Sequence, residues 1–183
     1  MNAKQIIATT LLLLGSTATY AQNAGSSATQ TAKLSLTDAI EITFVSTGTR
    51  TGNNVNLTFS TVNDYANGVE SGAQQLRVRS NRKCDISMEA SSDYFTYSGT
   101  TTPAPRMEVK DVLDLMISEN NTGGQINGGY HQYKHVDGNR DTRILNDCDR
   151  GDKTFSVKYK AAPGFEFPAG TYTVNMLYTA THD

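Results

Sequence analysis

The chain has 183 residues, a length that fits one domain of ordinary size. It carries 16 Lys and Arg against 18 Asp and Glu, and this near balance argues against nucleic-acid binding, which needs a basic excess. Thr, Ser, Asn and Gly are abundant, at 24, 14, 14 and 15 residues, and Trp is absent. Because Thr favours strands and the other three favour turns, the composition predicts an all-β fold.

Residues 1–21 have the pattern of a cleaved secretory signal peptide. Lys4 supplies the positive start, an apolar run follows from Ile6 to Leu14, and the small residue Ala21 precedes the expected cleavage point. The apolar run is too short to cross a bilayer, and the remaining chain has no second long one. We therefore expect export to the periplasm, the outer cell surface or the medium, with a flexible polar leader over 22–32 and one domain over 33–183.

Apolar and polar side chains alternate along several segments, which is the pattern of half-buried strands. The first run predicts one long strand, or two with a bend at Asp38, and consists of Leu34, Leu36, Ile40, Ile42 and Phe44. Shorter runs follow at 55–59, 76–80, 84–90, 95–97 and 155–159, and turn-forming residues at 48–54 predict a hairpin. The final strand is predicted to contribute Tyr172, Val174, Met176 and Tyr178 to the core. Seven or eight strands at this spacing predict an immunoglobulin-like, two-sheet antiparallel sandwich.

Two regions lack a clear period. Residues 107–118 fit either a helical face or a strand, and we favour a strand over 112–118. Residues 119–150 are polar and rich in Gly, which predicts a long loop in which Ile144 and Leu145 touch the core.

Two cysteines, Cys84 and Cys148, lie 64 positions apart along the chain. In an exported protein such a pair predicts a disulfide, which would stabilise the fold by about 4 kcal/mol if it is unstrained. The alternative is two buried free thiols. A metal site is less favoured because neither cysteine belongs to a C-x-x-C motif.

Motifs for metal binding and catalysis are weak. Asp137, Asn139 and Asp141 begin like a calcium loop, but Thr142 replaces its turn glycine and Cys148 its final glutamate, so a solvated acidic loop is favoured. His131 and His135 have the spacing of two metal ligands on a helix, yet no third ligand accompanies them. The chain has no G-x-S-x-G, P-loop or G-x-G-x-x-G motif. We therefore expect no metal, no cofactor and no enzymatic activity.

Two stretches resemble a known family. They are YANGVESGAQQLRVRSN at 65–81 and FSVKYKAAPGFEFPAGTYTVNMLYTAT at 155–181. Both are similar to a family of secreted bacterial β-sandwich proteins labelled domain of unknown function 4402, found in Gram-negative bacteria. The ending is also similar to the terminal strands of spore-coat-U-like and pilin-like proteins. The resemblance implies a fimbria-like structural role and transfers no catalytic residue.

These observations predict a secreted, non-enzymatic structural or adhesion subunit of the cell surface, whose partners are copies of itself or related subunits. The run from Leu34 to Phe44 is a candidate for strand exchange between copies, although pairing within its own domain is favoured. The alternative function is a glycan-binding module that uses the 119–150 region, with Tyr65, Tyr130 or Tyr133 as contacts.

Overall fold

The computed structural model describes residues 27–45 and 54–183 of the chain. The chain divides into two compact units, Met1–Ser35 and Leu36–Asp183. In the first unit, residues 27–35 are exposed and form neither helix nor strand. The predicted signal peptide and the predicted hairpin turn at 48–54 lie largely outside the described residues, so both stay predictions.

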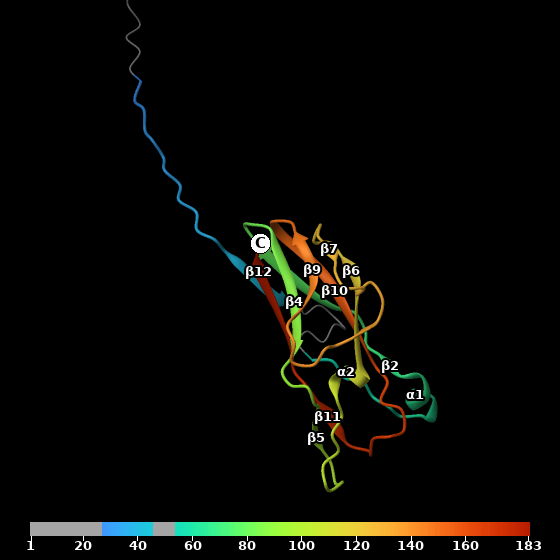
Figure 1. Ribbon diagram of the computed structural model, residues 1–183. Helices are drawn as coiled ribbons and strands as arrows, with labels where there is room; N and C mark the ends of the chain where they lie inside the picture. The colour runs from blue at the N-terminus through green and yellow to red at the C-terminus, as the bar shows by residue number, and fades with distance from the viewer. Residues whose placement is uncertain (1–26, 46–53) are drawn as a thin grey trace, which may run out of the picture. The chain divides into compact units, whose positions relative to one another are not determined.

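The second unit is an antiparallel β-sandwich, which confirms the predicted all-β class (Figure 1). The larger sheet has the order β1 (Ile40–Phe44), β3 (Gln74–Ser80), β10 (Gly151–Ala161), β6 (Leu113–Asn120) and β8 (Lys134–His135), and β2 (Val69–Glu70) also pairs with β10. The smaller sheet has the order β12 (Met176–His182), β4 (Cys84–Ala90), β9 (Thr142–Cys148) and β7 (Gln125–Ile126). A separate two-stranded pair joins β11 (Thr171–Thr173) to β5 (Thr96–Ser98), at the end of the unit opposite the C-terminus.

The core forms where the inward faces of the two sheets meet. The larger sheet contributes Leu76 and Val78 of β3 and Phe155 and Val157 of β10, and all four are almost fully buried. Ile86 and Met88 of β4 are equally buried in the other sheet. These residues occupy alternate positions along their strands, so the period-two pattern in the sequence reports the buried face correctly.

The region predicted as a long loop, 119–150, instead contains β7, β8 and β9. Ile144 and Leu145 are both fully buried, as expected, although they are neighbours in a strand. The register between β4 and β9 shifts on either side of Ile86, and these irregularities let consecutive residues face the core. The bulged strand therefore hides its alternation, and the loop prediction was wrong for this segment.

Two short helices precede strands of the larger sheet. α1 (Val62–Asn67) begins with a capping box in which the Thr61 side chain accepts from the Asp64 amide and the Asp64 carboxylate accepts from the Thr61 amide. α2 (Val109–Val112) leads directly into β6, so the mixed pattern at 107–118 reflects one helical turn followed by a strand.

The predicted strands at the two ends of the domain are shorter than expected. Strand β1 covers only the second half of the 34–44 run, while Leu34 and Leu36 are 83% and 80% exposed. The final strand is divided into β11 and β12 at Val174 and Asn175. Residues 55–59 are assigned to no strand, although their burial alternates as predicted.

Candidate functional site

The second unit has a groove of about 750 Å³, which we call the uncharged groove. Its floor is made by Phe44, Phe95, Met107, Val112, Leu113 and Tyr159. Residues 54–59 and 167–176 form its sides. None of the described residues that line it is charged, so the groove offers an apolar floor between amide and hydroxyl groups.

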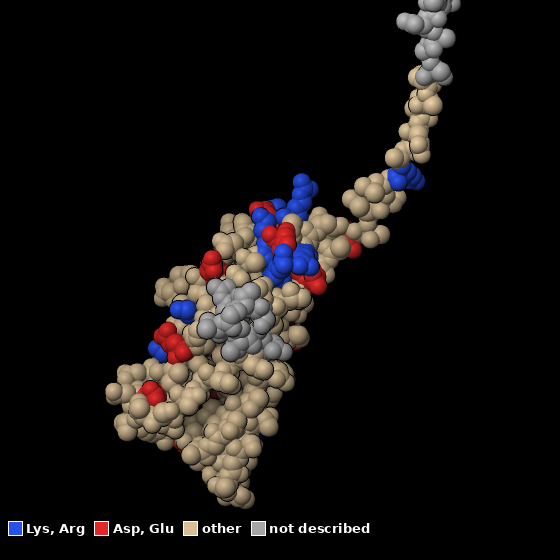
Figure 2. Space-filling view, turned by 180° about the vertical axis from the view of Figure 1, so that it is seen from behind, with Lys and Arg blue, Asp and Glu red and all other residues tan. Residues whose placement is uncertain are grey.

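The charged residues gather elsewhere on the same unit. In Figure 2 the Lys, Arg, Asp and Glu side chains crowd the upper part of the face, and the lower part is mostly uncharged and hollowed. On the outer face of β3, Arg79 pairs with Glu41 at 3.2 Å, and Arg77 pairs with Asp152 of β10. In each of these pairs a cation lies beside an anion, and none of the four residues lines the groove.

One side of the groove is an extended segment without a backbone partner. Within 54–59, Val55, Leu57 and Phe59 are half-buried and pack against the core, while the residues between them are exposed. No backbone hydrogen bond joins residues 55–59 to any other residue that the structure describes. Because extended backbone carries a row of donors and acceptors, such an edge is a template for another strand.

The other side of the groove comes from the divided final strand. Tyr172, Val174 and Met176, which were predicted as core residues of one strand, are half-buried and line the groove. Tyr178, the fourth residue of that set, lies in the core, where its hydroxyl is 2.6 Å from that of Tyr159. Burial raises the pKa of Tyr159 to about 12 and raises the pKa of Tyr178 well above its usual value.

The candidate strand-exchange residues fall into two groups, because Leu34 and Leu36 are exposed and outside any strand, while the other three are paired. Ile40, Ile42 and Phe44 pair with Ser80, Val78 and Leu76 of β3, so they belong to the chain's own sheet. The segment is anchored from Thr37 onward. Asn81 donates to the Thr37 carbonyl at 2.7 Å and accepts from the Ala39 amide at 3.0 Å, and Arg82 pairs with Asp38 at 2.8 Å.

The cysteines lie directly opposite each other, Cys84 at the start of β4 and Cys148 at the end of β9. Both are fully buried and are free thiols in the structure, so the predicted disulfide is not formed there and stays a prediction.

The other predicted sites are not assembled. Asp137, Asn139 and Asp141 are exposed, and no group of three or more His, Cys, Asp or Glu side chains suited to a metal occurs among the described residues. His131 lies in a turn and His135 in β8, where its Nδ1 is 2.6 Å from Asp114, so they do not share a helix face.

The tyrosines proposed for glycan contact are divided. Tyr130 is fully buried, which removes it as a contact, and Tyr133 is half-buried. Tyr65 stacks on Phe165 at the groove, with ring centroids 5.6 Å apart. The groove therefore draws on residues outside the 119–150 region, and the alternation at 55–59 is the one sequence pattern that points to it.

Comparisons with known proteins give limited information. No family model matches the chain, and no curated protein matches its sequence significantly, so the resemblance to domain of unknown function 4402 stays a prediction. A chain in a solved structure of a chaperone-usher pilus is similar, with a TM-score of 0.42 and 9% identity over 90% of this chain and 99% of that chain. We base no conclusion on a likeness at this level. None of the helices in the described part of the chain has the length and apolar character needed to cross a membrane.

Proposed function

We propose that the chain is an exported, non-enzymatic subunit of a cell-surface, fimbria-like assembly, in which the uncharged groove receives an extended segment from another copy. The observation that carries this proposal is the groove itself, with an apolar floor and an adjoining extended segment that has no described backbone partner. Added strands gain affinity from backbone hydrogen bonds and specificity from alternate side chains.

The segment that fits is residues 32–36 of a second copy. Ala32, Leu34 and Leu36 alternate with Lys33 and Ser35, and all five are exposed and lie outside any strand. Alternate residues of a strand point to the same face, so the three apolar side chains would meet the floor while the polar ones face solvent. Residues from Ile40 onward are already paired with β3, so donating them would break that ladder.

The energies predict reversible association. Burying each leucine contributes about 1.5–3 kcal/mol, and each backbone hydrogen bond adds about 0.5–1.5 kcal/mol net. Association itself costs about 4–15 kcal/mol, which offsets much of this gain. We therefore expect assembly that depends on protein concentration.

Light scattering after size-exclusion chromatography tests the proposal on protein expressed from the full-length sequence and recovered after export. The wild type should form a concentration-dependent series of oligomers. Leu34→Asp combined with Leu36→Asp should abolish it, because charged side chains oppose burial in an apolar groove. Ser35→Asp combined with Thr37→Asp adds the same charge on the opposite parity and should leave assembly intact.

A peptide with the sequence of residues 29–37, TQTAKLSLT, probes the groove directly. Labelled peptide should bind the Leu34→Asp and Leu36→Asp protein, and a peptide with the two leucines moved to positions 33 and 35 provides the control. A wild type that stays monomeric at high concentration, or a double variant that assembles like the wild type, would contradict the proposal.

The glycan-binding alternative has less support from this site. Stacked rings such as Tyr65 and Phe165 suit sugar faces, and Asn54, Asn56 and Thr58 offer polar contacts. An apolar floor of this extent is better matched by alternating aliphatic side chains than by sugar hydroxyls, which would lose hydrogen bonds to water there. A glycan array with the monomeric double variant would detect such binding.

A further inference from the structure

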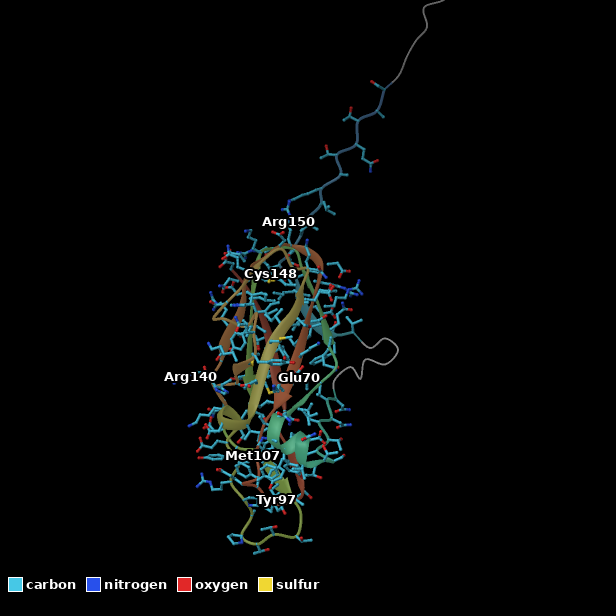
Figure 3. All side chains as sticks on the ribbon, turned by 90° about the vertical axis from the view of Figure 1, so that its right-hand side faces the viewer. Glu70, Tyr97, Met107, Arg140, Cys148 and Arg150 are labelled. Carbon is cyan, nitrogen blue, oxygen red and sulfur yellow. The ribbon has the colours of Figure 1, made fainter. Side chains whose placement is uncertain are left out.

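The second feature with chemical consequences is the cysteine pair, which lies away from the groove. Figure 3 places Cys148 near one end of the sandwich and Met107 of the groove floor towards the other. Cys84 and Cys148 are partners in the antiparallel register of β4 and β9. Directly opposite residues of such strands have Cα atoms about 4.5–5.5 Å apart, which lies within the range that a disulfide spans.

The two thiols are neighbours across the strand pair. Cys84 and Cys148 are opposite each other in the register, and the proximity of Cys148 is one of the causes that raise the pKa of Cys84. A disulfide would therefore join two residues that the backbone holds in place, without movement of either strand.

The folded protein encloses this pair on every side that the structure describes. Both cysteines are 0% exposed, and His182 of β12 is the neighbour of Cys84 on its other side. Thr122, itself fully buried, accepts a backbone hydrogen bond at 2.9 Å from Asp149, the residue that follows Cys148. The chain also crosses closely at Gly124, where an added Cβ would lie 2.8 Å from the Cys148 nitrogen. A disulfide reagent has no described path to either sulfur.

Burial also suppresses the reactive form of the thiols. It raises the pKa of Cys84 to about 11 and raises the pKa of Cys148 as well. Only the thiolate attacks a disulfide, so this rise lowers the thiolate fraction of Cys84 about a hundredfold at neutral pH, and that of Cys148 is lowered too. The lack of reagent access and the lowered thiolate fraction therefore both slow oxidation of the folded protein.

We propose that Cys84 and Cys148 form a disulfide that closes only before the sandwich folds, so that the redox state of the pair records the compartment in which the chain folded. The oxidant is a small or protein disulfide. One cysteine thiolate attacks it, forming a mixed disulfide and releasing one thiolate, and the second cysteine then displaces the other. The two thiols lose two protons and two electrons, and the oxidant becomes two thiols. The inference is independent of the groove and of its occupant.

The test compares oxidation rates in folded and unfolded protein. Exported protein is unfolded in urea with reductant, refolded by dilution, checked by circular dichroism and freed of reductant. Oxidised glutathione is then added to the folded form and, in parallel, to the form kept in urea. Remaining thiols are alkylated after acid quenching and denaturation, and counted by intact mass.

We expect protein taken directly after export to contain no free thiol, and the refolded dithiol form to oxidise at least about tenfold more slowly than the form in urea, because burial limits access and lowers the thiolate fraction. Two free thiols in the exported protein would overturn the proposal. So would a folded rate equal to the rate in urea, because neither effect of burial would then be operating.

A matched control separates burial from other effects of folding. In a variant with Cys84→Ala, Cys148→Ala and Thr100→Cys, the single thiol occupies an exposed position and should react with glutathione at similar rates in both states. If the reduced protein does not refold, the reverse reaction serves instead. Dithiothreitol should then reduce the folded exported protein far more slowly than the same protein in urea, and equal rates would contradict the proposal.

Discussion

Two hydroxyl groups in the core, those of Tyr159 and Tyr178, depend on each other for hydrogen bonding. They are 2.6 Å apart, and both side chains are buried. Tyr178→Phe should lower the free energy of unfolding by about 1–3 kcal/mol, because it leaves the buried Tyr159 hydroxyl without this partner. The double variant with Tyr159→Phe should cost less than the sum of the single variants, since no polar atom then remains unpaired. Urea unfolding measures all three, and strictly additive losses would contradict the prediction.

At the scale of elements, the Asn81 side chain holds the start of β1 in place. It bridges the Thr37 carbonyl and the Ala39 amide from the turn between β3 and β4. Asn81→Ala should lower the free energy of unfolding by about 1–2 kcal/mol through the loss of two hydrogen bonds. Amide exchange should accelerate at Ala39 and not along β10. Asn67→Ala, which removes one bond within α1, is the control, and unchanged exchange at Ala39 would refute the anchoring role.

The strands that could be predicted are those whose two faces meet different surroundings. β3 and β10 alternate in sequence because one face covers the core and the other carries exposed groups such as Arg77 and Asp152. β9 could not be predicted in this way, since its register irregularities bring both Ile144 and Leu145 into the core. α1 has a local sequence signal, the capping box at Thr61 and Asp64, which apolar alternation does not report.

The groove illustrates a second limit of sequence reasoning at this scale. Alternation at 55–59 correctly predicted which side chains turn inward. It could not predict that the segment has no backbone partner among the described residues. Pairing depends on where β11, β12 and the floor of the uncharged groove lie in space. Local patterns report the burial of a strand, while an open edge is a property of the assembled sheets.

Across the whole molecule, several buried tyrosines link stability to alkaline pH. Burial raises the pKa values of Tyr130, Tyr133 and Tyr159 to about 12, and it raises the pKa of Tyr178 well above its usual value. In the unfolded chain these tyrosine hydroxyls ionise at about pH 10. Above that pH the unfolded state binds fewer protons than the folded state, so the free energy of unfolding falls as pH rises. The stability is fully present below about pH 10 and is lost progressively towards about pH 12.

Urea unfolding at a series of pH values should therefore show a nearly constant free energy up to about pH 9 and a steady decrease above about pH 10. Tyrosinate absorbance at 295 nm should show that the exposed tyrosines ionise first, while the buried ones ionise together with the loss of the circular dichroism signal of the fold. The variant with Tyr159→Phe and Tyr178→Phe should lose less stability across the same range, because two of the shifted groups are gone. If every tyrosine ionises at about pH 10 in protein that is still folded, the buried hydroxyls do not control alkaline unfolding.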